Sequence, residues 1–300
     1  MPTVLEQISP EPMRQRLAEL CAADPSARVM SWLLGTPENL LYWAHTIGVA
    51  SHAALRNVVA PVPPAELRRL GGPPEEPVFL WTGLADIANF LGIYARLGAP
   101  PAGRKPRVLD FGCGIGRLTR YLEMHDGIEA FGLDANPAAV EWCQLNLTRV
   151  LTLLQAGLQK LPFGDGLFDL VYAPTLFAEG SASRMRRCLD EITRVMAPGG
   201  LLLAVTYGPT AVATIAASAA HQEQTGIDAA RAAELSAMLT QEGAVHVPFH
   251  AGEGAPEDQE GRAFIHPAHL AARWNNAFEV VEHLPGGLRQ WQDIVVLRRK

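Results

Sequence analysis

The chain has 300 residues, of which 48% are hydrophobic and 19% charged, and its formal net charge is −6 at neutral pH. This length allows one large domain, or one domain with a smaller appendage, to bury a core without disulfides or metals. The acidic balance argues against a nucleic-acid-binding protein, whose affinity comes mainly from neutralising phosphates. The four cysteines, Cys21, Cys113, Cys143 and Cys188, form no closely spaced pair, which favours a reduced, cytoplasmic protein.

Residues 1–104 are expected to form helices separated by proline breaks. The clearest helix covers residues 78–97 and is followed by Gly98. We interpret this part as an all-helical N-terminal cap, a separate domain from residues 105–300. Because its aromatic residues suit a small molecule or a sugar, we place Trp81 in the substrate pocket.

From residue 105 onward, short apolar strands alternate with helices. This alternation predicts an α/β fold, namely a doubly wound, mostly parallel seven-stranded sheet with helices on both faces and an antiparallel edge strand. Residues 244–263 are expected to be irregular. The expected strands are 107–111, 128–134, 150–154, 168–173, 201–206, 278–283 and 292–298, and the expected helices are 117–124, 136–147, 183–196 and 211–242.

We expect neither a secretion signal in the first residues of the sequence nor a membrane span in its longest uncharged stretch. The first 16 residues have no apolar stretch of the kind that directs secretion. The uncharged stretch 201–220 is long enough to resemble a membrane span, but it contains Gly208 and Pro209 and begins like a buried strand. We therefore expect no association with a membrane.

A glycine-rich turn between the first strand and helix of this region carries the chemistry. Its sequence, DFGCGIGR over residues 110–117, lets the backbone turn sharply and approach a ligand closely, with helix amides behind it. Arg117 stands where the dinucleotide fingerprint GxGxxG has its third glycine, which argues against an NAD site. An acid-led GxGxG loop instead resembles motif I of class I S-adenosylmethionine (SAM) methyltransferases.

The resemblance covers roughly residues 106–206. Asp134 ends the second strand, 18 residues after Gly116, where an acid can accept both ribose hydroxyls. The segment from Leu161 to Val171 is similar to the family's approach to its fourth strand, and Arg194-Val-Met-Ala-Pro-Gly-Gly resembles the turn before its fifth. The resemblance implies a Rossmann-like fold with SAM as the cofactor.

The resemblance also implies a set of cofactor contacts. The glycine-rich loop should face the methionine part of SAM, with Asp110 near the ammonium group, and Asp134 should hold the ribose. Asn136 either flanks the adenine or only caps a helix. The family often has Asp-Ala at positions 157 and 158, but Gly157 and Leu158 stand here, so a carboxylate for the adenine amino group is missing. The full set is Asp110, Gly112, Cys113, Gly114, Gly116, Asp134, Ala135, Asn136, Leu158, Gln159 and Ala173.

The acceptor side is less clearly marked. The segment after the fourth strand, YAPTLFAE over residues 172–179, is not Asn-Pro-Pro-Tyr and lacks the acidic cluster of metal-dependent catechol-type enzymes. Tyr172 is our first catalytic candidate, because its ring or hydroxyl could lie beside the sulfonium; the alternative is a core tyrosine. Tyr207, just past the fifth strand, is the second candidate, and Phe177 is assigned to the substrate pocket.

Four histidines, His246, His250, His266 and His269, have spacings that could suit zinc. No cysteine lies near them, so we expect solvated or helix-capping roles and no metal site. One of them could be a base for the acceptor, and the sequence does not select which.

The sequence therefore favours a metal-independent, SAM-dependent methyltransferase of biosynthesis that acts on a small molecule or glycan by in-line methyl transfer. One alternative is an enzyme of the same fold that cyclises SAM to azetidine-2-carboxylate and methylthioadenosine. Another is a non-catalytic partner protein of the SAM-binding fold. A homo-oligomer is compatible with either enzyme.

Overall fold

The structure is a computed structural model. It describes residues 60–300, except for residues 124, 126, 156–159, 180–181 and 250–260; before residue 60 it describes only residues 15, 18, 19, 22 and 23. Most of the expected N-terminal cap lies outside the described residues, and so do Leu158 and Gln159, two of the expected cofactor contacts. The chain divides into two compact units, Met1–Ala156 and Gly157–Lys300.

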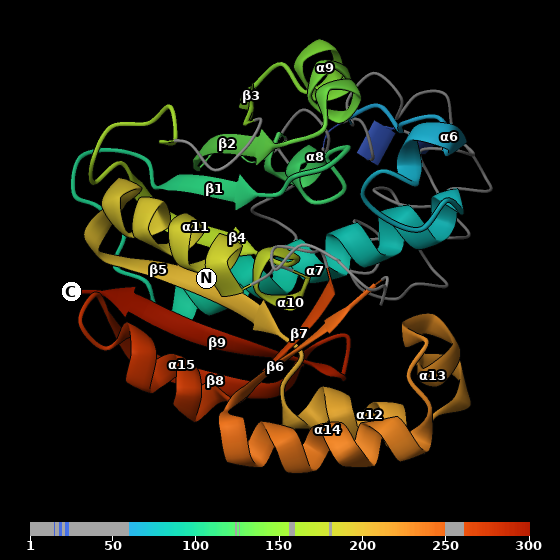
Figure 1. Cartoon of the computed structure of the whole chain (residues 1–300). Helices are drawn as coiled ribbons and strands as arrows, with labels where there is room; N and C mark the ends of the chain where they lie inside the picture. The colour runs from blue at the N-terminus through green and yellow to red at the C-terminus, as the bar shows by residue number, and fades with distance from the viewer. Residues whose placement is uncertain are drawn as a thin grey trace. The chain divides into compact units, whose positions relative to one another are not determined.

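The first unit contains a parallel three-stranded part of the sheet, with β2 between β3 and β1 (Figure 1). Asn136 caps α9 by accepting hydrogen bonds from the amides of Ala138 and Ala139, at 3.0 and 3.2 Å, and Pro137 follows as the first helical residue. The described elements are α6 (Ala65–Arg68), α7 (Glu76–Leu97), β1 (Arg107–Phe111), α8 (Thr119–Leu122), β2 (Glu129–Asp134), α9 (Pro137–Asn146) and β3 (Val150–Leu154).

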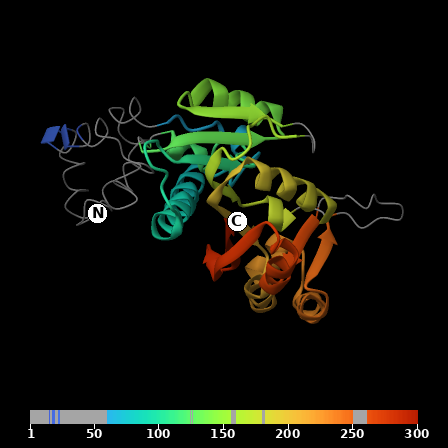
Figure 2. The same ribbon diagram turned by 90° about the vertical axis from the view of Figure 1, so that its left-hand side faces the viewer.

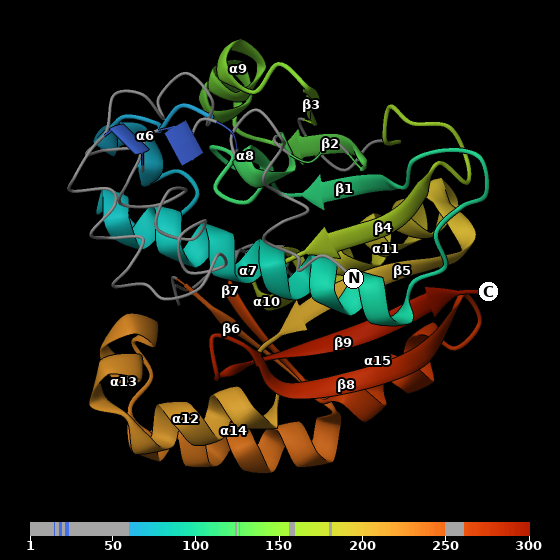
Figure 3. The ribbon, with the colours of Figure 1, turned by 180° about the vertical axis from the view of Figure 1, so that it is seen from behind.

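Helix α7 is the longest described helix of the first unit and is shown in cyan in Figure 3. Its length and hydropathy are enough to cross a membrane, but 61% of its apolar window is buried inside the protein, as in the core helix of a globular domain. The predicted helix 78–97 is confirmed within two residues, and Gly98 follows it.

The second unit contributes the strands β4, β5, β9 and β8, in that order. Every residue of β4 is buried, including Asp169, as expected for a central strand covered on both faces. The elements are β4 (Phe168–Ala173), α10 (Leu176–Glu179), α11 (Ala182–Val195), β5 (Met196–Thr206), α12 (Pro209–Ala217), α13 (Ala219–Thr225), α14 (Ala229–Glu242), β6 (Ala244–Pro248), β7 (Gly261–Ile265), α15 (Pro267–Trp274), β8 (Phe278–Leu288) and β9 (Gln292–Arg299).

The seven strands have the order β3-β2-β1-β4-β5-β9-β8, which confirms the predicted, mostly parallel α/β sheet. One detail of the prediction was wrong. The antiparallel strand β9 lies between β5 and β8 and is antiparallel to both, so the strand at the edge, β8, runs in the same direction as β5. The long hairpin places the chain's last strand inside the sheet.

The region after β5 also differs from the sequence prediction. Residues 211–242, expected to be helical, lie in three helices, and α12 packs against α14 (Figure 2). Residues expected to be irregular contain the hairpin strands β6 and β7, and Phe264 of β7 bridges to Tyr207. These elements enclose a hydrophobic cluster at the end of β5. Its buried members are Ala178, Tyr207, Ala211, Val212, Ile215, Ile227, Ala232, Leu235, Leu239, Val245, Phe264 and Trp291.

Candidate functional site

The glycine-rich loop follows β1, at the carboxyl end of that strand, where ligands bind in open α/β sheets. Gly112, Gly114 and Gly116 have φ angles of 85°, 52° and 79°, in the left-handed region that favours glycine. The amides of Gly112 and Cys113 donate to the Leu133 carbonyl of β2, at 2.8 and 3.0 Å. The loop is therefore tied to the neighbouring strand while its tight turns depend on glycine.

Asp134, the last residue of β2, holds the loop from the other side. One oxygen of its half-buried carboxylate accepts a 2.7 Å hydrogen bond from the Gly114 amide, and the other accepts a 2.8 Å bond from the Asn136 amide. Because a carboxylate has about four acceptor positions, capacity remains for the hydroxyls of a ribose. The structure brings three of the predicted cofactor residues together here, and the ribose contact stays a prediction.

Asp110 and Asn136 each have a structural partner. Asp110, the fourth residue of β1, is 1% exposed and accepts a 2.7 Å hydrogen bond from the Thr119 hydroxyl of α8. The capping interpretation of Asn136 is confirmed by its bonds to α9. Ala135, between Asp134 and Asn136, is exposed. Contacts of these residues with an ammonium group or an adenine stay predictions.

Two buried thiols, one in the loop itself and one in α9, lie next to the loop backbone. The Sγ atoms of Cys113 and Cys143 lie 3.8 and 3.6 Å from the Gly114 carbonyl oxygen. A hydrogen bond to Cys143, reinforced by burial, raises the pKa of Cys113 well above its usual value. Cys113 therefore remains a thiol and packs against the loop instead of acting as a nucleophile. Cys143 was missed by the sequence analysis, because nothing in the sequence pairs α9 with this loop.

Helix α7 contacts the far end of the same loop. Arg117 donates to the carboxylate of Asp86 at 2.7 Å, and both side chains are at most 10% exposed. A side chain at Gly83 would meet the Arg117 carbonyl oxygen, so the helix packs directly against the loop backbone. Asp86 was also missed; the signal was an acidic residue on the otherwise apolar helix 78–97.

In the second unit, the predicted acceptor residues are mostly buried. Tyr172 and Ala173 of β4 are fully buried, and Phe177 of α10 packs on Trp274 with ring centroids 5.1 Å apart. Trp81, on α7 of the first unit, is 52% exposed. No contact with a substrate follows from these positions, so the catalytic and pocket assignments stay predictions.

Tyr207 lies at the carboxyl end of β5, within the hydrophobic cluster. Its ring packs on Phe264 and Trp291, with centroids 5.6 and 5.1 Å apart. Burial, and then the charge of Glu179, raise the pKa of Tyr207 to about 12, although a hydrogen bond with Arg262 acts in the opposite direction. The phenol therefore keeps its proton at neutral pH and can donate a hydrogen bond, but it is a poor general base.

Three of the four histidines with zinc-like spacings lie within the described residues. Among the residues that the structure describes, no group of three or more His, Cys, Asp or Glu side chains is arranged to hold a metal ion. His266 caps α15 by accepting a 3.2 Å hydrogen bond from the Ala268 amide. Burial lowers the pKa of His246 and of His269, and His250 lies outside the described residues.

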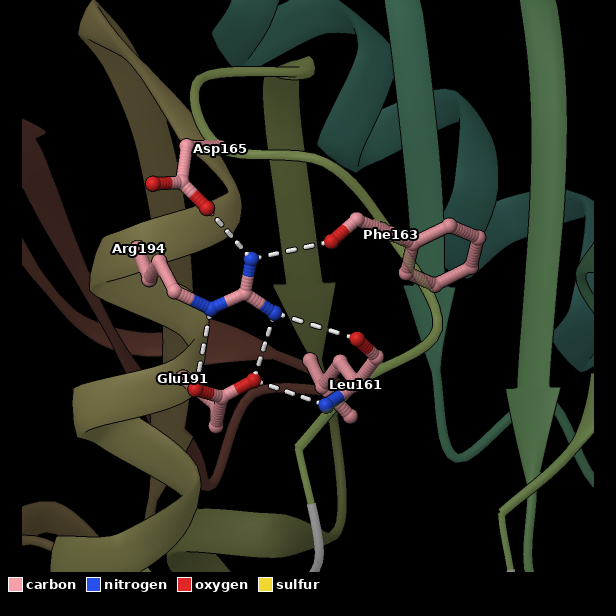
Figure 4. A network of polar contacts seen from close by, with 5 residues as sticks. All are labelled: Leu161, Phe163, Asp165, Glu191 and Arg194. Carbon is pink, nitrogen blue, oxygen red and sulfur yellow. Dashed lines mark hydrogen bonds and ion pairs between the residues drawn. The ribbon is translucent and has the colours of Figure 1, made fainter.

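Arg194 of α11 fixes the segment that leads into β4 (Figure 4). Its guanidinium donates to the carbonyls of Leu161 and Phe163, at 3.0 and 2.9 Å, and to the Asp165 carboxylate at 2.6 Å. It also pairs with Glu191 at 2.6 Å, and this carboxylate accepts a hydrogen bond from the Leu161 amide. One side chain thus holds the whole Leu-Pro-Phe segment that carried part of the family resemblance.

Residues 109–204 match a family model described as a methyltransferase domain. Over 99 residues the chain is 35% identical to an uncharacterized methyltransferase of Synechocystis, covering 33% of this chain and 46% of that protein. It is 31% identical over 112 residues to a probable chloroplastic tocopherol O-methyltransferase of Oryza sativa, covering 35% of this chain and 30% of that protein. The chain thus spans less than half the length of these curated relatives.

The malonyl-[acyl-carrier protein] O-methyltransferase of Legionella pneumophila is 34% identical over 106 residues, which cover 34% of this chain and 37% of that protein. Among solved structures, the 1,6-didemethyltoxoflavin-N1-methyltransferase of Burkholderia thailandensis has a TM-score of 0.47 and 18% sequence identity, over 73% of this chain and 80% of that chain. A SAM-dependent methyltransferase of Methanosarcina mazei has a TM-score of 0.45 and 17% identity, over 69% of this chain and 96% of that chain.

Proposed function

We propose that this chain, in which residues 109–204 form a domain of the class I SAM-dependent methyltransferase family, transfers the methyl group of SAM to a small molecule or glycan without a metal. The match to the methyltransferase model carries the proposal, because it runs from β1 to β5 and includes the glycine-rich loop and Asp134. SAM is the cofactor of that family, and when bound it supplies an electrophilic methyl group on a sulfonium.

The residues of the first unit fit this cofactor. Gly112 and Gly114 adopt left-handed backbone conformations that leave the loop free of side chains at those turns. Asp134 stands half-buried at the carboxyl end of β2, with acceptor capacity beyond its two amide bonds. These groups would hold the methionine and ribose parts, and they would orient the cofactor for in-line transfer to an acceptor.

Three observations support a small-molecule or glycan acceptor. The net charge of −6 gives no electrostatic attraction to nucleic acid. The carboxyl end of β5, the side of an open α/β sheet at which ligands bind, carries the buried aromatic rings of Tyr207, Phe264 and Trp291, and the described members of its hydrophobic cluster include no basic residue. The relatives include proteins named for tocopherol and for malonyl-[acyl-carrier protein]. The buried free thiols Cys113, Cys143 and Cys188 accord with a location in the reducing cytoplasm.

The test begins with purified protein and SAM. Isothermal titration calorimetry should detect binding of SAM and of S-adenosylhomocysteine, and failure to bind either would refute the proposal. Mass spectrometry of an incubation without acceptor should find SAM intact; enzymatic formation of methylthioadenosine with a cyclic amino acid would instead establish SAM cyclisation. A library of hydroxylated and amino compounds is then screened for release of S-adenosylhomocysteine, which is expected with at least one of them.

A further inference from the structure

The hairpin of β8 and β9 brings a histidine and an aspartate together at the ligand-binding edge of the sheet. Because β9 is antiparallel to both β5 and β8, the last residues of β8 lie at the same edge as the carboxyl end of β5. Asp293 pairs in register with Thr206, the last residue of β5, and His283 lies in β8. Ligands of open α/β sheets bind at this edge.

Asp293 is held in a single orientation. Its side chain is fully buried, and one carboxylate oxygen accepts a 2.9 Å hydrogen bond from the Gly286 amide. The other oxygen lies 3.0 Å from Nε2 of His283. A side chain on Gly208, directly after Tyr207, would collide with this carboxylate, so the backbone at the end of β5 also encloses it. The aspartate is therefore placed to orient one partner, the imidazole of His283.

The carboxylate decides which nitrogen of that imidazole carries the proton. An ionised carboxylate can only accept hydrogen bonds, so Nε2 of His283 must be the donor. In the neutral ring, Nδ1 is then left with a lone pair that can accept a proton. The side chain is 30% exposed, and among the described residues its ring is hydrogen-bonded to Asp293. A buried carboxylate that fixes the tautomer of an accessible imidazole is the arrangement that activates hydroxyl groups in other enzymes.

We propose that His283, oriented by Asp293, is the general base of this enzyme and that its acceptor is a hydroxyl compound, an inference that rests on the proposed methyltransferase function. The acceptor O–H bond breaks and its proton moves to Nδ1 of His283. The acceptor oxygen forms a bond to the methyl carbon as the sulfur–methyl bond breaks, and that electron pair stays on the sulfur of S-adenosylhomocysteine. The Asp293 carboxylate stabilises the imidazolium, which then releases its proton to water.

A general base at this position favours a hydroxyl acceptor over an amine. A neutral amine already has a nucleophilic lone pair and needs little help from a base, whereas an alcohol or phenol reacts much faster as its proton is removed. Tyr207, a predicted catalytic residue, directly follows the last residue of β5. It keeps its proton because its pKa is raised. The imidazole of His283 supplies at this edge a proton acceptor that Tyr207 does not supply.

A purely structural pair would fasten the hairpin without taking part in catalysis, and His283→Gln separates the two roles. The glutamine amide can still donate to Asp293, so the hairpin keeps its bond, but it cannot accept a proton as imidazole does. Asp293→Asn tests orientation, because an amide no longer requires Nε2 to be the donor. The matched control is His266→Asn, which changes another histidine of the same unit and preserves its helix cap, since asparagine is a good N-cap residue.

The first readout needs no acceptor. Nuclear magnetic resonance of the ¹⁵N-histidine-labelled protein, saturated with S-adenosylhomocysteine, should show His283 with a proton on Nε2 and none on Nδ1. The signal is assigned by its loss in His283→Gln, and its pattern should change in Asp293→Asn but not in His266→Asn. A neutral ring that carries its proton on Nδ1 would overturn the proposal, because that nitrogen could then not act as the base.

The second readout uses phenols and aliphatic alcohols as probes, each paired with the corresponding amine, and follows S-adenosylhomocysteine release. His283→Gln should lower kcat for the hydroxyl probes by about 10²- to 10⁴-fold with little change in SAM affinity. Amine probes, where accepted, should lose much less. Unchanged kcat for hydroxyl probes in His283→Gln, or acceptance of amines alone, would overturn the inference and leave the methyltransferase function intact. Failure to bind SAM would refute the function itself.

Discussion

The glycine-rich loop of the first unit, which we propose as the cofactor site, and the edge of the second unit that we propose for the acceptor (the acceptor edge) are built in opposite ways. The loop offers backbone groups of Gly112 and Gly114 together with one carboxylate, that of Asp134. These residues lie within 23 residues of one another in the sequence. The acceptor edge is made of side chains from Tyr207, β7 and the β8–β9 hairpin, which are far apart in the sequence. A backbone cradle suits a ligand common to a whole family, whereas assembled side chains can vary with the acceptor.

The largest effect on stability is expected at the buried ion pair of Asp86 and Arg117, which lies at the end of the glycine-rich loop. Asp86→Ala should lower the free energy of unfolding by about 3–5 kcal/mol, because it leaves the Arg117 guanidinium buried without its carboxylate. Urea denaturation measures this. The double variant Asp86→Leu with Arg117→Met removes both charges and should recover most of the stability. A loss below about 1 kcal/mol in Asp86→Ala would mean that the ion pair is not needed there.

The next largest effect is expected on SAM affinity, at Asp134, whose carboxylate is hydrogen-bonded to the glycine-rich loop. Asp134→Ala should weaken SAM binding by about 10- to 100-fold, because hydrogen bonds to a charged group contribute about 1.5–3 kcal/mol. Calorimetry with SAM measures the change. Glu234→Gln removes one negative charge from an exposed pair on α14 and is the matched control, with unaltered affinity expected. Equal affinity in Asp134→Ala and the control would remove Asp134 from the binding site.

The second unit is predicted to tolerate the loss of its most connected arginine better than the first unit tolerates Asp86→Ala. Arg194→Met should cost about 1–2 kcal/mol, because its side chain is 19% exposed and water replaces part of each lost bond. Thermal unfolding measures the loss, and Arg231→Met, which removes an exposed pair, should be nearly neutral. A cost equal to that of Asp86→Ala would erase this difference between the units.

The smallest effect compares one buried tyrosine in each unit. Burial raises the pKa of both Tyr121 and Tyr207 to about 12, from an ordinary value of 10.0. Between pH 10 and 12 the folded protein therefore binds more protons than the unfolded chain, so stability that is present below pH 10 is lost as the pH rises toward 12. Unfolding at several pH values should show a shallower decline in Tyr121→Phe and in Tyr207→Phe. An unaltered decline in both variants would contradict the assignment.

Much of the fold was predictable because its strands are local apolar runs bounded by glycine, proline or polar residues. The predicted bounds of β3 and β4 are those observed, Val150–Leu154 and Phe168–Ala173. The hairpin of β6 and β7 was missed because its strands, Ala244–Pro248 and Gly261–Ile265, are short and stabilised by each other across an intervening segment. Pairing of that kind leaves no periodic pattern in either strand alone.

The candidate site, like the fold, contains residues that could be predicted from local sequence patterns and others that could not. The loop glycines and Asp134 could be recognised because their spacing is fixed by one strand-turn-helix-strand unit. Asp86 could not be paired with Arg117, 31 residues away, since only packing of α7 brings them together. His283 and Asp293 are 10 residues apart, at the end of one expected strand and the start of the next, so pairing the expected strands 278–283 and 292–298 as a hairpin was the signal that could have brought them together.

The position of β9 inside the sheet has a consequence for synthesis of the chain. All three strands of the first unit are present once residue 154 has been made, so that part of the sheet can pair early. In contrast, β5 is complete at Thr206 but gains its neighbour β9 only from Gln292 onward. Until then one edge of β5 has no neighbouring strand, for a longer stretch of synthesis than β1 waits for β4, so the nascent second unit is exposed to aggregation for longer.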